Sequence, residues 1–218
     1  KISDLFYKNK YSNFGHKLIK GADSLQSKNI DDLYFNLISN IKNPTEWLIN
    51  SEEHSNTNYN FDPKISGIER MMIKDLVGYL PTDILTKVDR TSMAVSLEAR
   101  TPFLDKEIVK FALTLPLEYK IKAEVGKSVL RDVLYKYVPK DMIERPKMGF
   151  GVPLAEWMRG ELRVWCEDLL SEKKLNDDGF FNSKLIREKW NEHLKGDVDW
   201  HHELWNVLIF QAWLENNR

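Results

Sequence analysis

Hydrophobic residues recur with helical spacing along most of this chain, and that spacing limits its fold more than any other feature. Ile30, Leu33 and Leu37, for example, fall on one face of a helix at steps of three and four residues. No stretch shows the alternation of apolar and polar residues that is typical of a half-buried strand. The sequence therefore predicts a mostly α-helical fold, and we expect a single helical domain over residues 1–218.

Caps and prolines indicate where the central helices begin and end. Ser66 and Glu69 have the spacing of a capping box, which predicts a helix that opens at this point. Pro81 should break that helix, because proline lacks a backbone N–H and clashes with the preceding turn. We expect a second helix over residues 82–97.

The segments that follow predict a connector and several further helices. Pro102 disfavours helical geometry at the residue before it, so "TPFL" is expected to be extended. Asp105 can cap the next helix, which should stop at Pro116. We expect exposed loops over residues 50–65 and 145–153, and helices over 126–139, 154–158, 161–170, 183–194 and 199–215.

The segment "GKSVLRDVLYKYVP" predicts a helix with five residues facing inward: Val129, Leu130, Val133, Leu134 and Tyr137. Its first three residues also match the end of a Walker phosphate loop. That motif requires a glycine five residues earlier, where this chain has Ile121, and no strand is expected before it. We therefore exclude a Walker loop.

Composition excludes several classes of partner. The 32 basic and 33 acidic residues give a net charge of −1, so no overall field favours nucleic acid or an anionic membrane. No apolar run approaches the roughly 20 residues that a membrane span needs. The adjacent histidines of "WHHELW" face different ways on a helix, and no spaced ligands accompany them, so we expect no metal site.

Cys166 is the single cysteine, so the chain can form no internal disulfide. A reducing compartment such as the cytoplasm fits this composition best. The residue lies in the apolar run "LRVWCEDLL", which favours a packing role over a reactive one.

The stretch "YLPTDILTKVDRTSMAVSLEARTPFLD" combines many charges with core-like apolar residues. Asp83, Lys87 and Arg90 share one helix face, where Asp83 and Lys87 can form an ordinary surface ion pair. Glu98 and Arg100 follow at the end of this helix. They can either hold a polar site together or simply pair with each other.

A second candidate is the loop "RPKMGFGVP". Its Lys147 stands between a proline and a Gly-Phe-Gly turn, where a lysine can deliver a point charge to a phosphate or a developing oxyanion. The segment alone equally allows an ordinary exposed lysine.

Three segments together resemble one enzyme family. They are the charged stretch above, "GKSVLRDVLYKYVPKDMIERPKMGFGVPLAEWM" and the terminal "LWNVLIFQAWLE". In this order they are similar to the C-terminal half of the synthetase domain of glutamine-hydrolysing asparagine synthetases, with a special likeness to the bacterial branch associated with surface polysaccharides. The resemblance is strong over residues 66–214 and weak over residues 1–61.

The resemblance implies an activity and a larger fold. Such enzymes use ATP and Mg²⁺ to adenylate the side chain of aspartate, and ammonia from a glutaminase domain then gives asparagine, AMP and pyrophosphate. They are cytoplasmic, and the resemblance also allows a homodimer. This chain would be the helical C-terminal portion of an α/β domain of the adenine-nucleotide α-hydrolase type.

The resemblance also assigns candidate roles to particular residues. Lys147 matches the family's catalytic lysine, and Asp83 falls at an acidic position that orients a catalytic side chain in related lactam-forming enzymes. Four further residues are expected to support the phosphate or substrate site, although Lys127 and Arg131 equally fit an ordinary helix face: Glu98, Arg100, Lys127 and Arg131.

Two family motifs are absent from this sequence. Neither the pyrophosphate loop Ser-Gly-Gly-x-Asp-Ser nor the segment Gly-Glu-Gly-x-Asp-Glu occurs, so the parallel sheet that carries them would lie upstream. We therefore expect a piece of a longer enzyme that is inactive alone and binds no cofactor tightly. Two alternatives stay open: an amidotransferase for another carboxylate in polysaccharide assembly, and a non-catalytic helical interaction module.

Overall fold

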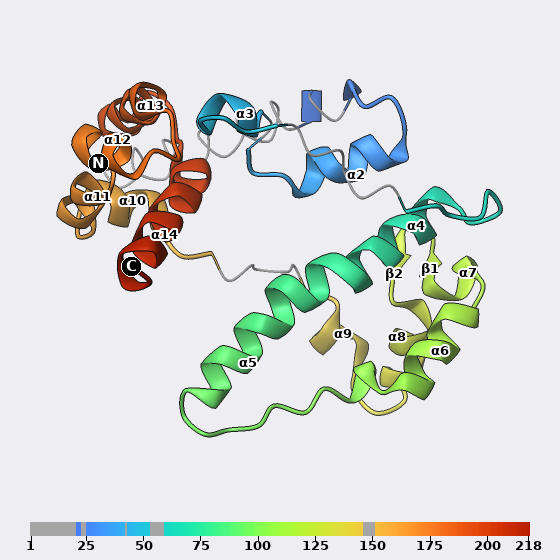
Figure 1. Cartoon of the computed structure of the whole chain (residues 1–218). Helices are drawn as coiled ribbons and strands as arrows, with labels where there is room; N and C mark the ends of the chain where they lie inside the picture. Colours follow the sequence, from blue (N-terminus) through green and yellow to red (C-terminus); the bar gives the residue numbers. More distant parts are fainter. Residues whose placement is uncertain (1–20, 23–24, 42, 53–58, 146–150) are drawn as a thin grey trace, which may run out of the picture. The chain divides into compact units, whose positions relative to one another are not determined.

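The computed structural model divides into two compact units, which are described separately (Figure 1). Unit 1 comprises residues 1–60 and 151–218, and unit 2 comprises residues 61–150. The expectation of one domain over the whole chain stays a prediction. The structure describes residues 21–22, 25–41, 43–52, 59–145 and 151–218. Part of the predicted loop over residues 50–65 therefore lies outside the described residues.

Unit 2 begins with a long helical segment made of α4 (Gly67–Lys74), η1 (Asp75–Leu85) and α5 (Thr86–Met93). The predicted capping box is confirmed, because the Ser66 hydroxyl accepts from the Glu69 backbone N–H and the Glu69 carboxylate accepts from the Ser66 N–H. The start of this helix was thus readable from the sequence.

The predicted break at Pro81 is wrong, because the chain passes it as the π-helix η1. A π-helix bonds each N–H to a carbonyl five residues back, and its wider turn accommodates the proline ring. Hydroxyls satisfy nearby carbonyls: Thr82 donates to the oxygen of Gly78 and Thr86 to that of Pro81, both at 2.8 Å. The helix also ends at Met93 instead of about residue 97.

The rest of unit 2 is built from short elements. The predicted cap is confirmed, since Asp105 Oδ1 accepts from the Glu107 N–H at 2.9 Å. The prediction that "TPFL" is extended is partly wrong, because residues 102–104 form a short 3₁₀ helix, whose first position suits Pro102. The elements are η2 (Pro102–Leu104), α6 (Lys106–Thr114), α7 (Leu117–Lys120), β1 (Ile121–Lys122), β2 (Val125–Gly126), α8 (Ser128–Leu134) and α9 (Lys140–Ile143).

Within the described ranges, the only sheet is the small antiparallel hairpin of β1 and β2. The prediction of a mostly α fold is therefore confirmed. No helix in the described part of the chain has the length and apolar character needed to cross a membrane.

Unit 1 contains helices from both ends of the sequence. Backbone bonds join them, since the Asn182 N–H donates to the oxygen of Trp47 and the Ile49 N–H to that of Phe180, both at 2.8 Å. Its helices are α2 (Ile30–Ile38), α3 (Pro44–Trp47), α10 (Leu154–Arg159), α11 (Arg163–Leu169), α12 (Glu172–Asp178), α13 (Ser183–Lys195) and α14 (His201–Asn216).

Helices α3, α10, α11, α12, α13 and α14 supply the hydrophobic core. Trp190 is fully buried at its centre, and its indole N–H donates to the Glu167 carboxylate, so the polar atom of this large ring is satisfied. The core comprises Trp47, Met158, Cys166, Leu169, Leu170, Leu175, Phe181, Ile186, Trp190, Leu204, Val207 and Leu208.

A polar cluster ties α10 to the turn between α13 and α14. The Asp199 carboxylate lies 2.8 Å from His201 Nδ1 and 3.4 Å from Arg159 Nη2, and Arg159 Nε donates to the His193 backbone oxygen at 2.7 Å. Burial raises the pKa of Asp199, but hydrogen bonds from the two histidines and the charge of Arg159 outweigh it and hold that pKa well below its ordinary range. The Asp199 carboxylate therefore stays ionised, and its contacts stabilise unit 1 above the ordinary pKa of an aspartate.

Cys166 offers a first test of the core. It is fully buried, as its packing role requires, and burial raises the pKa of its thiol to about 11. Because the thiolate is the reactive form, we expect a disulfide reagent to label native Cys166 about 10²-fold or more slowly than the unfolded chain at neutral pH. Absorbance of the released thiol measures both rates. Fast labelling of the native chain would contradict this placement.

Unit 2 has no comparable core. Among its described residues only Ser128 is buried. Of the five residues predicted to face inward in α8 and the turn after it, Val129 and Leu134 are half-buried. The prediction is wrong for the other three, because Leu130 is 44%, Val133 49% and Tyr137 81% exposed. Apolar spacing marks a face that avoids water, and in unit 2 little chain covers that face. Other exposed apolar residues of unit 2 include Ile68, Met72, Val77, Tyr79, Ile84, Val88, Phe103, Ile108 and Phe111.

Candidate functional site

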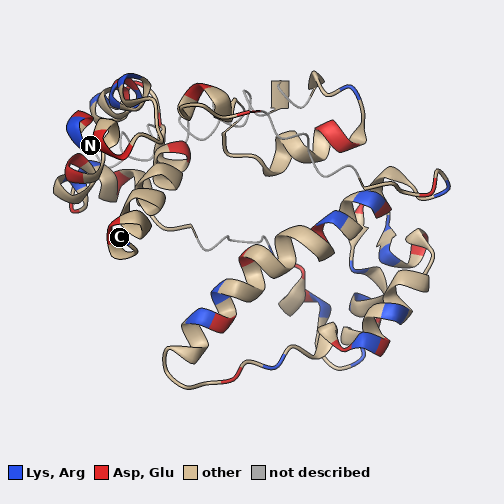
Figure 2. Cartoon of the chain, in the orientation of Figure 1, with Lys and Arg blue, Asp and Glu red and all other residues tan. Residues whose placement is uncertain are grey.

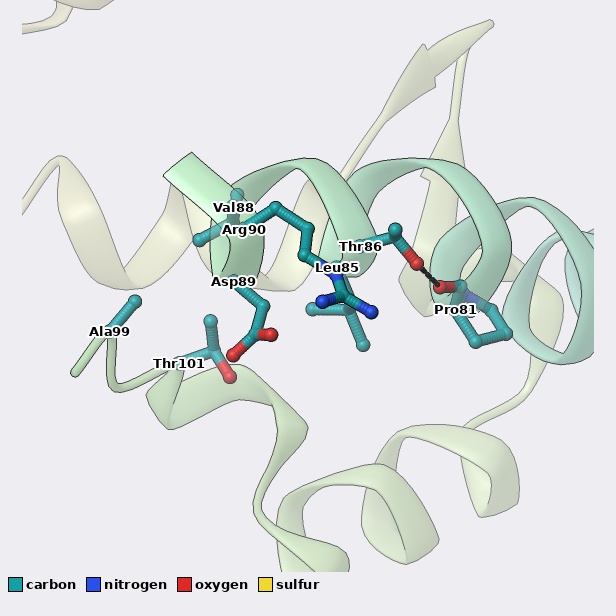
Figure 3. A pocket seen from close by; sticks show the side chains of 8 residues that line it. All are labelled: Pro81, Leu85, Thr86, Val88, Asp89, Arg90, Ala99 and Thr101. Carbon is teal, nitrogen blue, oxygen red and sulfur yellow. Dashed lines mark hydrogen bonds between the residues drawn. The ribbon is translucent and has the colours of Figure 1, made fainter. Parts of the chain in front are cut away.

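The charged stretch of unit 2 forms an open cleft of about 410 Å³ (Figure 3). Its floor comes from η1 and α5, and its other side from the connector that returns beneath them. In Figure 3 the Asp89 carboxylate points toward Thr101, and the Arg90 guanidinium extends toward Leu85. The lining residues are Pro81, Leu85, Thr86, Val88, Asp89, Arg90, Ala99 and Thr101.

The cleft combines one carboxylate, one guanidinium cation and two hydroxyl groups with an apolar floor. Thr86 is held in place, since its hydroxyl donates to the backbone oxygen of Pro81. Asp89 and Arg90 are exposed, so they can meet a polar ligand without first losing a buried partner. Such a cleft suits a small ligand that carries both charges, although none of its residues is buried enough to exclude water.

Asp83 does not line this cleft. Its carboxylate lies 2.6 Å from Lys87 Nζ, one helical turn further on, and the Lys87 side chain is 70% exposed. The pairing expected from the spacing is confirmed, and the hydrogen bond to Asp83 raises the pKa of Lys87. A catalytic role for Asp83 stays a prediction.

Glu98 and Arg100 pair with each other. Arg100 Nη2 lies 3.0 Å from the Glu98 carboxylate, and both side chains are exposed in unit 2. Of the two arrangements that the sequence allowed, the structure therefore contains the simple pair. Their support of a substrate or phosphate site stays a prediction.

These two surface pairs should contribute little to stability. We expect Asp83→Asn and Glu98→Gln each to change the free energy of unfolding of the 218-residue chain by less than about 0.5 kcal/mol, because exposed pairs are screened by water. Urea unfolding followed by circular dichroism measures both. A loss above about 2 kcal/mol would mean instead that the charges belong to a buried network.

Lys127 and Arg131 lie at the start of α8 but have different surroundings. Lys127 is exposed at the N-cap, with a left-handed backbone (φ 63°) that residues other than glycine rarely adopt. Arg131 contacts Gly126, Tyr135 and Glu144, and its side chain is mostly covered. The structure thus places Arg131 in a side-chain cluster within unit 2, and its expected support of a phosphate stays a prediction.

Lys147 lies outside the described residues, so its assignment stays a prediction.

Sequence reasoning missed Asp89 and Arg90 as cleft residues. Their positions within the charged stretch were visible, but only the path of the connector brings Ala99 and Thr101 opposite them.

The distribution of charged and metal-ligating side chains limits which ligands the two units can bind. Both signs of charge are interspersed over each unit, and no basic stripe follows any element (Figure 2). Within the described ranges, His, Cys, Asp and Glu side chains form no group of three that could hold a metal ion.

Comparison with known proteins identifies the family. The family described as Asparagine synthase matches residues 2–215, nearly the whole chain. Asparagine synthetase [glutamine-hydrolyzing] 1 of Bacillus subtilis is 33% identical over 148 residues, which are 68% of this chain and 23% of that protein. A putative glutamine-hydrolyzing asparagine synthetase of Mycobacterium bovis is 37% identical over 147 residues, 67% of this chain and 22% of that protein.

The match extends to animals, where the glutamine-hydrolyzing asparagine synthetase of Gallus gallus is 30% identical over 138 residues, 56% of this chain and 24% of that protein. No solved structure matches this chain significantly. The chain spans about a quarter of the length of these relatives. On the family match over residues 2–215, this chain belongs to the asparagine synthase family.

Proposed function

We propose that this chain is the helical C-terminal part of the synthetase domain of a glutamine-dependent asparagine synthetase. The observation that carries the proposal is the family match over residues 2–215, together with the relatives named as glutamine-hydrolyzing asparagine synthetases. The longer protein would act as a carbon–nitrogen ligase that consumes ATP, aspartate and ammonia released by a glutaminase domain.

The described residues do not fit ATP and Mg²⁺ by themselves. Within the described ranges no carboxylate group is arranged for a metal, and the sequence contains no pyrophosphate loop. We therefore assign the cradle for ATP and Mg²⁺ to other parts of the longer protein and derive no step through either. From this chain we assign Lys147, whose fixed positive charge would stabilise the anionic transition state of adenylation.

The complete protein that carries this chain provides the test. We expect it to form AMP and pyrophosphate only when ATP, aspartate and either glutamine or ammonium are present, with asparagine as the product. Chromatography of the amino acids and a coupled pyrophosphate assay measure these. Release of AMP without dependence on any nitrogen donor would overturn the proposal.

A second enzyme function is kept because this chain contains no identified aspartate-selecting residue. An amidotransferase for a sugar acid would release AMP with a hexuronic acid instead of aspartate, so a panel of carboxylates separates the two. We also propose that the chain belongs to the surface-polysaccharide branch of the family, and this proposal is supported by the resemblance of the motifs alone.

The third alternative is a helical module without catalysis. It predicts no AMP release by the complete protein with any carboxylate.

The cytoplasmic location and a homodimer are proposals too, and sedimentation analysis of the complete protein tests the homodimer. For the 218-residue chain alone we expect no micromolar binding of ATP by calorimetry.

A further inference from the structure

The cleft of unit 2 contains two charged side chains that have no partner. The other charges of the stretch from residue 79 to residue 105 are in use, because two ion pairs join four of them and Asp105 caps α6. Within the part of the chain that the structure describes, the side chains of Asp89 and Arg90 make no hydrogen bond or ion pair, even with each other. One negative and one positive group in the same cleft are therefore available to a ligand.

Two threonine hydroxyls complete the polar lining of the cleft. Thr86 donates its hydroxyl hydrogen to the backbone oxygen of Pro81 over 2.8 Å, so its oxygen can only accept from a ligand. The Asp89 carboxylate points toward the hydroxyl of Thr101, which has no hydrogen-bond partner among the described residues (Figure 3). The lining thus offers several acceptors near Asp89 and the N–H donors of a guanidinium, which fits a ligand with one cationic and one anionic group.

We propose that this cleft binds the α-amino-acid end of aspartate, with Asp89 as the partner of the ammonium group and Arg90 as the partner of the α-carboxylate. The inference rests on the proposed function. A guanidinium can bind a carboxylate through two parallel N–H donors, and the three ammonium hydrogens match the Asp89 carboxylate and the threonine oxygens. The volume of about 410 Å³ lies within the range of small-molecule sites.

The side-chain carboxylate of aspartate would remain outside these contacts. Among the described residues that line the cleft, Arg90 is the only basic one, so no second cation is present for a second carboxylate. The floor near Leu85 and Val88 is apolar and suits the methylene group of the substrate. The cleft would therefore hold the end of aspartate that does not react and leave the reacting carboxylate free.

The two charges also distinguish between the candidate substrates. A hexuronic acid has a carboxylate but no ammonium group, so it would leave the Asp89 carboxylate without a positive partner beside the ligand. A site built for a polar contact rejects a ligand that lacks the matching group much more strongly than an apolar pocket rejects a missing methylene. The inference therefore favours aspartate over a sugar acid as the substrate.

The test uses Asp89→Asn and Arg90→Gln in the complete protein, since each removes one charge. We expect each variant to raise the KM for aspartate about tenfold or more, because hydrogen bonds to charged groups contribute that factor to binding. The KM for ATP should stay within about twofold. Matched controls are Asp132→Asn and Lys136→Gln, which alter exposed side chains of the same unit and should leave both constants normal. Melting temperatures show that each variant is folded.

Two analogues of aspartate test the partner of each charge. Succinate lacks the ammonium group and β-alanine lacks the α-carboxylate, and both can be measured as competitive inhibitors of asparagine synthesis. In Asp89→Asn, the ratio of the inhibition constant of succinate to the KM for aspartate should fall about tenfold, while the ratio for β-alanine stays constant. Arg90→Gln should show the reverse. Equal losses for all three ligands in both variants would indicate a general disturbance and would overturn the inference.

The outcomes also separate this inference from the proposed function. If the complete protein forms asparagine and both variants keep a normal KM for aspartate, the inference fails and the proposed function stands. A rise in the KM for ATP alone would overturn it too. If the complete protein forms no asparagine, the proposed function fails, and calorimetry of aspartate binding decides about the cleft. Binding that weakens in both variants would support the amino-acid site, and absent or unchanged binding would overturn it.

Discussion

Replacement of Lys147 with methionine in the complete protein is expected to lower the rate of asparagine synthesis by about 10²-fold or more. Methionine keeps much of the length of lysine but removes its charge. Loss of one preorganised electrostatic group from a transition state typically costs this much. If the charge acts mainly in the transition state, kcat and kcat/KM should fall together. Steady-state assay of asparagine and pyrophosphate measures both.

Two measurements control this result. Lys110→Met removes an exposed lysine of unit 2, paired with Glu107 over 3.2 Å, and should leave synthesis normal. Glutamine hydrolysis, which we assign to another domain, should largely survive in Lys147→Met. Near-normal synthesis by the variant would mean that Lys147 is not catalytic and is an ordinary exposed lysine, which its segment equally allows.

Much of the helical fold could be predicted because the signals are local. The helices over residues 183–195 and 201–216 follow from periodic apolar residues, and Gly196 ends the first with a positive φ of 78°. Helix α12 was missed because Leu175 is its single apolar residue. Its caps were visible in Ser171, which accepts from the Lys174 N–H, and in Gly179 with φ 73°.

The π-helix η1 shows where a local rule fails. Proline forbids a regular α-helix, but it does not forbid a wider turn, and the choice depends on whether neighbouring groups satisfy the free carbonyls. Here Thr82 and Thr86 do so through their hydroxyls. Their spacing around Pro81 is visible in the sequence, and at this proline it accompanies continuation of the helix.

The candidate site was less predictable because its contacts are not local. The Asp83–Lys87 pair follows from helix spacing, whereas the contact of Arg131 with Glu144 spans 13 residues and depends on how the chain turns after α8. The cleft likewise needs the path of the connector to Thr101. Sequence spacing identifies which residues share a helix face but not which segment lies opposite them.

The second large effect concerns the stability of unit 1. We expect Leu204→Ala to lower its free energy of unfolding by about 3–5 kcal/mol, since Leu204 is fully buried in the core and its truncation leaves a cavity. All seven tryptophans of the chain belong to unit 1, so their fluorescence during urea unfolding reports on that unit alone. Val164→Ala is the matched control: it is 82% exposed in α11 and should cost under about 0.5 kcal/mol.

Leu130 of unit 2 extends this comparison to the longer protein. It is 44% exposed, so Leu130→Ala should destabilise α8 by under about 1 kcal/mol in the 218-residue chain, measured by hydrogen exchange. If further chain covers this apolar face in the complete protein, as the proposed function requires, the same substitution should cost about 2 kcal/mol or more there. An equally small cost in both would mean that the face stays exposed. Unit 2 would then lack the apolar burial that a part of a larger synthetase domain needs.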